Sequence, residues 1–217
     1  MRSLVDRFVR HLRSGHPAVV ILNTALRIGI VLFTIDALVN AGDERFAGKA
    51  LGPRNVGILL GFSMLFPILQ WGFRRWKRYP WWSDCLYLSV PFLDMLGNTL
   101  NLYNSIEWWD HVPHLHGTGA LAVVFMAAFD FAPIAAAGLA TMLHTALEID
   151  EYYGDVLFHT HNVKGIADSI NDLAFGLAGV IAYVLLYRRL RPLRRREPRR
   201  GSERPRVSLP GRRTAHN

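Results

Sequence analysis

Cysteine, charge and familiar catalytic motifs are all scarce in this sequence. Its 217 residues include one cysteine, Cys85, so a disulfide-stapled scaffold is excluded. There is no cysteine pair for a zinc or iron–sulfur site, and no Walker, G-x-S-x-G or H-E-x-x-H motif occurs. Charged residues make up only 19% of the chain and hydrophobic residues 51%, which excludes intrinsic disorder of the whole chain.

The formal net charge of +8 is distributed very unevenly. Residues 188–217 carry +10 and residues 1–17 carry +3, which leaves −5 for residues 18–187. A basic chain first suggests nucleic acid as a partner, but a hydrophobic, mildly acidic body with basic ends argues against it. We predict a basic N-terminus (1–17), a transmembrane domain (18–187) and a disordered tail rich in Arg and Pro (188–217), which would attract anionic lipid headgroups.

Hydrophobic runs long enough to cross a bilayer recur along the body. Because a hydrocarbon core of about 30 Å requires roughly 20 helical residues, the sequence predicts an all-α fold, a polytopic membrane helix bundle of about six transmembrane helices. The expected spans are Ala18–Asn40, Asn55–Phe73, Ser83–Tyr103, Val112–Phe131, Pro133–Ile149 and Ile166–Tyr187. The six tryptophans lie near span ends, where aromatic belts form.

Lys and Arg in the loops predict the orientation of these spans. With six spans, the side that holds both termini collects 20 of these residues, and the opposite side collects 4. We therefore expect a multi-pass protein of a bacterial-type plasma (inner) membrane with both termini in the cytoplasm. Arg27 lies inside the first span and should pair with a nearby acid, whereas Asp84 is expected to be interfacial at the cytoplasmic end.

Three clusters of polar side chains lie near the predicted outer ends of the last three spans. Within each cluster, spacings of three or four residues place pairs of side chains on the same helix face. The clusters are Asp110, His111 and His114; His144, Glu148, Glu151 and Asp155; and Asp168, Asn171 and Asp172. The topology is derived from hydropathy and basic residues alone. The positions of the acids are not used, so their convergence at one end is independent of the topology prediction. Ionisable groups at such depths are functional candidates by default.

Carboxylates and imidazoles on facing helices are typical ligands of metal sites in helix bundles. A divalent metal such as Zn, Mn, Fe or Mg would offset the mutual repulsion of the acids; without it, several would have raised pKa values. We predict the following metal ligands: Asp110, His111, His114, Glu148, Glu151, Asp168 and Asp172. Asp110, Glu148 and Glu151 are the candidate catalytic groups. Haem ligation by His114 and His144 is an alternative, whereas His159 and His161 are expected to be solvated.

The order and spacing of these motifs resemble a known family. Asp110-x-x-x-His114, Glu148-x-x-Glu151-Tyr152-x-x-Asp155 and Asp168-Ser169-x-x-Asp172-Leu173 are similar to the YjdF-like family of uncharacterised multi-helix bacterial inner-membrane proteins. A looser similarity links the chain to VanZ-like proteins. The resemblance implies an integral membrane protein with an acidic and histidine signature, and it implies no particular activity.

Three functions fit this set of residues. The first is a metal-dependent hydrolase or transferase that acts on a lipid or other amphipathic substrate at the outer leaflet. The second is a small proton- or cation-coupled transporter that uses the same carboxylates. The third is a non-catalytic membrane scaffold in which the polar cluster holds helices together and the tail recruits a partner.

Overall fold

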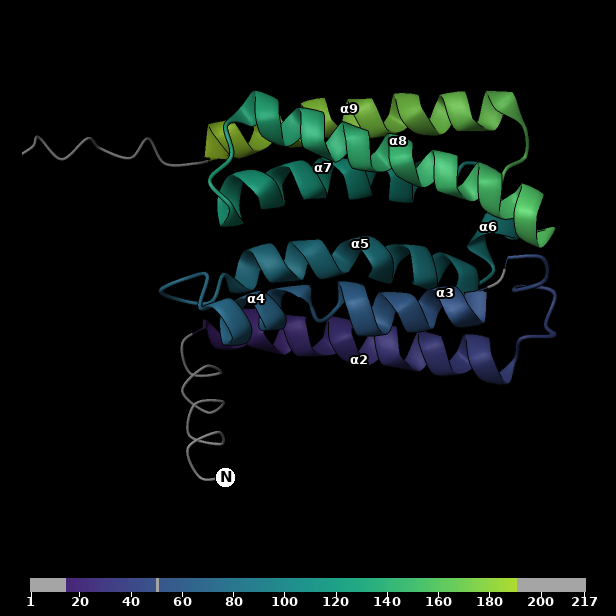
Figure 1. Ribbon diagram of the computed structural model, residues 1–217, viewed down its shortest axis with the longest axis horizontal. Coiled ribbons are helices and arrows are strands. Elements are labelled where there is room, and N and C mark those ends of the chain that lie inside the picture. Colours follow the sequence, from purple (N-terminus) through teal and green to yellow (C-terminus); the bar gives the residue numbers. More distant parts are fainter. Residues whose placement is uncertain (1–14, 50, 191–217) are drawn as a thin grey trace, which may run out of the picture.

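The computed structural model describes residues 15–49 and 51–190, and within them it is all-α, with no strand (Figure 1). The elements in chain order are α2 (Pro17–Val39), α3 (Leu51–Gly57), the π-helical segment η1 (Ile58–Phe62), α4 (Leu65–Phe73), α5 (Trp81–Thr99), α6 (Leu102–Ser105), α7 (His111–Ala128), α8 (Pro133–Phe158) and α9 (Ile166–Leu190). The long helices lie side by side along the longest axis of the molecule.

The bundle has two halves that meet where α5 packs against α7 (Figure 1). One half contains α2, α3, α4 and α5, and the other contains α7, α8 and α9. Because the long segments alternate in direction, the start of α7, the end of α8 and the start of α9 lie at one end of the bundle, which we call the site end. The start of α2 and the start of α5 lie at the opposite end.

The predicted all-α fold is confirmed, and the predicted membrane spans are confirmed in part. Three helical stretches are long and apolar enough to cross a membrane: Pro17–Val39, Leu51–Phe73 and Ile166–Leu190. The other three expected spans correspond to α5, α7 and α8, which form helices close to the predicted positions but are not among these three. The predicted tail lies outside the described residues, except that α9 continues through Leu190.

The second apolar stretch is a helix with an irregular centre. Its hydrogen bonding widens so that the Ser63 N–H donates to the Ile58 carbonyl at 2.9 Å, five residues back. Pro67 follows, and because proline has no N–H it cannot pair with the carbonyl of Ser63, four residues earlier. The Arg27 guanidinium of α2 donates to that carbonyl instead. The proline therefore creates an acceptor inside the bundle that a neighbouring helix uses.

Arg27 also pairs with a buried acid at the opposite end of the bundle. Its Nη2 lies 2.7 Å from Oδ2 of Asp84, which also accepts hydrogen bonds from Asn23 Nδ2 at 2.8 Å and the Tyr79 hydroxyl. Asp84 lies in the first turn of α5 but is fully buried inside the bundle, where it serves as a partner of Arg27. The expected acidic partner of Arg27 is identified as Asp84.

Small residues let α7 and α9 approach closely. A side chain at Gly179 would collide with the Leu115 backbone, and one at Gly119 would meet the Gly179 carbonyl at 2.7 Å. Gly176 faces His144 of α8, and a Cβ there would collide with the imidazole ring. This close packing brings the polar residues of α7, α8 and α9 within reach of one another.

Candidate metal centre

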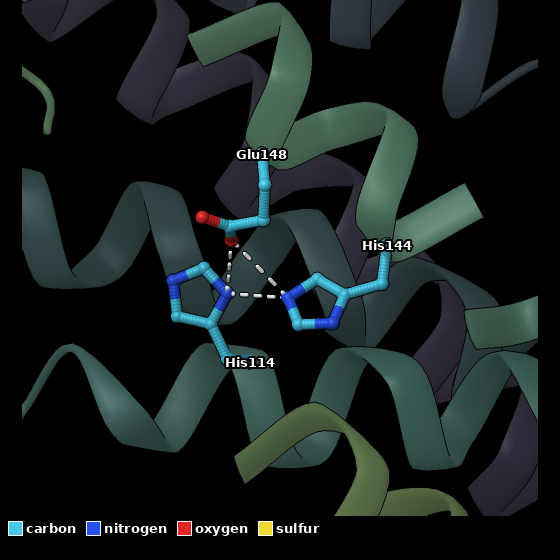
Figure 2. Close-up of side chains that lie close together, drawn as sticks. All are labelled: His114, His144 and Glu148. Carbon is cyan, nitrogen blue, oxygen red and sulfur yellow. Dashed lines mark hydrogen bonds and ion pairs between the residues drawn. The ribbon is translucent and has the colours of Figure 1, made fainter. Parts of the chain in front are cut away.

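Two helices supply the first group of converging donors, His114 from α7 and both His144 and Glu148 from α8 (Figure 2). His144 and Glu148 are four residues apart and so share a helix face. His114 Nδ1 lies 2.8 Å from His144 Nε2 and 3.3 Å from Glu148 Oε1, and His144 Nε2 lies 3.3 Å from the same oxygen. Donors about 2.1 Å from one tetrahedral ion are about 3.4 Å apart. Both contacts with Glu148 Oε1 have this spacing, whereas the two imidazole nitrogens are joined by a hydrogen bond and would separate slightly to bind a common metal ion.

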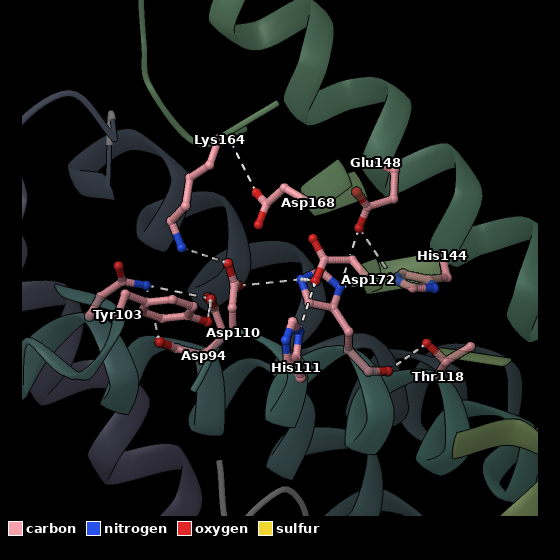
Figure 3. Close-up of polar contacts among 12 residues, drawn as sticks. Asp94, Tyr103, Asp110, His111, Thr118, His144, Glu148, Lys164, Asp168 and Asp172 are labelled. Carbon is pink, nitrogen blue, oxygen red and sulfur yellow. Dashed lines mark hydrogen bonds and ion pairs between the residues drawn. The ribbon is translucent and has the colours of Figure 1, made fainter. Parts of the chain in front are cut away.

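The same histidine belongs to a second group of donors, whose two acids, Asp110 and Asp172, are labelled in Figure 3. His114 Nε2 lies 3.5 Å from Oδ1 of Asp110 at the start of α7 and 3.7 Å from Oδ1 of Asp172 on α9. His111 Nδ1 lies 3.6 Å from that Asp172 oxygen. In each of the two groups, the three donor atoms lie within 4.8 Å of one another.

Several atoms of this centre are buried without a hydrogen bond. Glu148 Oε1, Asp172 Oδ1 and His111 Nδ1 all lack a hydrogen-bond partner. The side chains of Glu148 and Asp172 are each only 6% exposed. Unpaired buried carboxylates are costly, so a cation at this place would satisfy groups that are otherwise unfavourable.

Asp110 differs from the other acids because a cation of the chain lies beside it. Lys164 Nζ is 3.1 Å from Asp110 Oδ2, which leaves Oδ1 directed at His114. Burial acts to raise the pKa of Asp110, but the contacts with His114 and Lys164 lower it by more, so the net pKa lies below its ordinary value. Asp110 is therefore a carboxylate at neutral pH and a ready oxygen ligand.

The structure brings together most of the predicted ligands. Asp110, His111, His114, Glu148 and Asp172 meet, whereas Glu151 and Asp168 belong to neither three-donor group. Asp168 accepts the Lys164 N–H at 3.0 Å. Glu151 is partly buried on α8 and interacts electrostatically with Glu148 and Arg54. The catalytic assignments of Asp110, Glu148 and Glu151 stay predictions.

His144 is the donor missing from the predicted ligand set. Its sequence signal was present, since it lies one turn before Glu148 on the same face of α8. The ring is 6% exposed, and its position depends on the absence of a side chain at Gly176. The sequence spacing indicates the shared face, but only the packing of α9 shows that the ring turns toward His114.

Asp155 turns away from the centre and holds the loop between α8 and α9. It accepts hydrogen bonds from the Thr160 hydroxyl at 2.6 Å and from the N–H groups of Asn162 and Val163, each at 2.8 Å. Burial acts to raise the pKa of Asp155, but these hydrogen bonds together lower it by more, so the net pKa lies below its ordinary value. His159 and His161 are exposed, as predicted. This loop carries Lys164 to Asp110.

Other acids at the site end are already paired with cations. Asp36 lies 3.2 Å from Arg45, and Asp94 forms an ion pair with Arg54 and accepts the Tyr103 hydroxyl at 2.8 Å. The acids in these pairs have a structural role. Glu148 and Asp172 differ from them, because no Lys or Arg partner is seen for either among the described residues.

An apolar groove lies beside the centre. Its volume is about 380 Å³, within the range of small-molecule sites, roughly 300–1,000 Å³. It is lined mainly by Leu93 of α5, His111, Val112 and Leu115 of α7, and Phe175 and Tyr183 of α9. The His111 ring stacks on Phe175 with centroids 4.2 Å apart, so His111 separates the groove from Asp172. Deeper in the bundle, both His116 nitrogens are used, by Ser89 and Tyr183, each at 2.8 Å.

Comparison with protein-family models, curated proteins and solved structures yields no match for this chain. What it can do is therefore inferred from the centre itself. Two imidazoles and a carboxylate resemble the ligand sets of zinc sites that keep a further position for water or substrate. The class that the fold and the centre define is a helical protein with candidate membrane spans and buried His, Glu and Asp groups that can hold a metal ion.

Proposed function

We propose that the protein is a six-span membrane protein that binds a divalent metal ion at His114, His144 and Glu148. The observation that carries the proposal is the buried Glu148 Oε1, which has no hydrogen-bond partner and lies 3.3 Å from a nitrogen of each imidazole. Two nitrogen donors and one oxygen donor favour Zn, Fe or Mn over Mg.

Six spans are supported by the exposed surface of the bundle. Only 17% to 28% of each of the three hydrophobic windows is buried within the protein, so most of this apolar surface faces outward. α8 likewise exposes Met142 and Ile134, which are 70% and 88% accessible. Large outward-facing apolar surfaces are expected in lipid and are rare on soluble monomers. Exposed Trp71, Trp82 and Trp108 near helix ends fit interfacial belts.

We propose hydrolysis or group transfer on an amphipathic substrate as the reaction. The metal, when bound, would supply Lewis acidity and an activated water. The groove supports an apolar part of the substrate, because it runs beside α7 from His111 toward Tyr183. Asp110 lies at the site end, where its unprotonated carboxylate can accept a proton from a polar reacting group. With this topology the site faces the outer leaflet.

Metal content of the purified protein tests the proposal. Full-length protein purified in detergent should contain Zn, Fe or Mn at about one or more equivalents by elemental analysis. Glu148→Gln should lose the ion held by His114, His144 and Glu148, since the amide keeps the shape of the side chain but removes its charge. Asp150→Asn is the matched control, because Asp150 is exposed on the same helix, and it should keep the metal.

The opposite result would overturn the proposal. If protein reloaded with Zn, Mn or Fe and then desalted retains no more metal than the Glu148→Gln variant, the centre does not bind metal. Reconstituted protein that moves cations across liposomes without retaining any of them would instead support the transporter that the sequence also allows.

A further inference from the structure

His114 is the donor common to both three-residue groups, and it contributes a different ring nitrogen to each. Nδ1 faces His144 Nε2 at 2.8 Å and Glu148 Oε1 at 3.3 Å. Nε2 faces Asp110 Oδ1 at 3.5 Å and Asp172 Oδ1 at 3.7 Å. The imidazole thus lies between two sets of donors; Figure 2 shows His114 with the first set, and Figure 3 shows Asp110 and Asp172 of the second.

One metal ion cannot use both nitrogens of an imidazole. Each nitrogen directs its bond outward in the plane of the ring, and the two directions diverge. A cation at Nδ1 is therefore held on the His144 and Glu148 side, and one at Nε2 on the Asp110 and Asp172 side. The two groups define two positions.

We propose that the centre is binuclear, with His114 as the ligand shared by two divalent cations. This inference rests on the proposed metal site at His114, His144 and Glu148 and adds a second position at Asp110, His114 and Asp172. Neutral imidazole has one N–H, so binding at both nitrogens releases that proton to water and leaves a bridging imidazolate.

Charge complementarity supports two cations. The bridging imidazolate, Glu148, Asp110 and Asp172 together carry four negative charges, which two divalent cations balance. Lys164 Nζ pairs with Asp110 at 3.1 Å, and Asp168 lies next to the Lys164 backbone, so these two opposite charges also balance. With a single divalent cation His114 stays neutral, and the three carboxylates then leave one negative charge in a largely buried place, which is unfavourable.

Each position has its own unpartnered buried oxygen. Glu148 Oε1 belongs to the first position and Asp172 Oδ1 to the second, and both side chains are 94% buried. His111 Nδ1 is also buried without a hydrogen-bond partner and lies 3.6 Å from Asp172 Oδ1. It can serve as a further ligand of the second position, while its stacking on Phe175 orients the ring.

Stoichiometry with a single metal as probe tests this inference. Metal-stripped full-length protein in detergent, titrated with Zn²⁺, should bind two equivalents. Asp172→Asn should bind one, because it removes a charge from the second position alone. Glu148→Gln should also bind one, held on the Asp110 side. Asp150→Asn, which alters an exposed acid, should still bind two.

Loading the protein with Cu²⁺ distinguishes two ions that share His114 from two ions bound at independent sites. Two Cu²⁺ ions joined by an imidazolate couple their spins, so the doubly loaded wild type should lose most of the EPR intensity expected for two coppers. The Asp172→Asn variant, with one copper, should recover the full intensity for that ion. The loss of intensity is measured on the wild-type protein, and the Asp172→Asn variant serves only as the single-copper reference.

The outcomes separate this inference from the metal site on which it rests. One Zn²⁺ equivalent that persists in Asp172→Asn and disappears in Glu148→Gln would overturn the binuclear centre and leave the proposed function intact. Two equivalents with uncoupled copper signals would overturn the shared histidine. No retained metal in wild type would overturn both proposals.

Discussion

The two ends of the bundle each bury acids, but they satisfy them differently. At the opposite end, Oδ2 of Asp84 accepts from Arg27, Asn23 and Tyr79, while its Oδ1 is buried without a hydrogen-bond partner. At the site end, the buried oxygens of Glu148 and Asp172 face histidines and each other's negative charge. The chain supplies its own cation to Asp84. The comparison indicates that Glu148 and Asp172 are arranged for a cation that comes from solution.

The largest expected effect is on the stability of the opposite end, where Arg27 pairs with Asp84. Arg27→Ala leaves a fully buried Asp84 without its cation and the Ser63 carbonyl without its donor, so the unfolding free energy should fall by about 3–5 kcal/mol. Unfolding in mixed micelles measures this. Metal content per folded protein should not change, because the centre lies at the other end of the bundle. Loss of metal from the folded variant would contradict the separation of the two regions.

A smaller effect is expected at the site end, and only when metal is present. Glu148→Gln removes a repelling charge, so metal-free protein should be as stable as wild type or slightly more so. At free Zn²⁺ one hundred times the dissociation constant, a single site stabilises wild type by about 2.7 kcal/mol. The variant should lose that increment. Thermal unfolding with and without Zn²⁺ measures both values, and strong destabilisation of the metal-free variant would refute the contrast with Asp84.

A substitution at Gly176 tests whether the packing of α9 against α8 positions the His144 ring. Gly176→Ala places a methyl group against the His144 ring, so the ring must move and metal affinity should fall at least tenfold, with overpacking costing about 1–3 kcal/mol. Gly138→Ala on α8 is the control, because a Cβ there meets nothing within 4 Å. Competition with a metal indicator measures the affinity. Equal affinity in both variants would show that His144 is not a ligand.

The smallest effect concerns the loop that carries Lys164. Asp155→Asn weakens the hydrogen bonds to Thr160, Asn162 and Val163, so the amides of Asn162 and Val163 should exchange several-fold faster with deuterium. Since the pKa of Asp155 is lowered in the folded protein, its contribution is present above the unfolded pKa of about 3.9 and disappears as pH falls through the folded value. Unchanged exchange in the variant would exclude this role for Asp155.

The helical class and the convergence of the polar clusters were predictable from the sequence. The lengths of the apolar runs predicted the helices. Because successive helices run in opposite directions, the topology placed Asp110, Glu148 and Asp172 at one end of the bundle. The ring orientation of His144 was not predictable, because it depends on the close approach of α9 at Gly176. The sequence also could not predict that Asp155 points away from the centre. Its spacing places it on the same helix face as Glu148 and Glu151, but its hydrogen bonds are formed with the loop that follows α8.

The pairing of Arg27 illustrates a second limit of sequence reasoning. Spacing within α2 cannot identify Asp84, which lies on a helix 57 residues away along the chain. Nor does it reveal that Pro67 leaves the Ser63 carbonyl open to the same guanidinium. Both contacts depend on which helices are neighbours and on their rotation about their own axes, which are properties of the packed bundle.

This arginine also has a consequence for how the protein is made. An arginine near the centre of a membrane helix costs about 2.5–3.5 kcal/mol on insertion scales. Its acceptors, Ser63 and Asp84, are synthesised later than α2. We therefore expect α2 to enter the bilayer inefficiently on its own and to be retained by the translocon until α4 and α5 emerge. In biogenesis, the first half of the bundle would be a single unit of insertion.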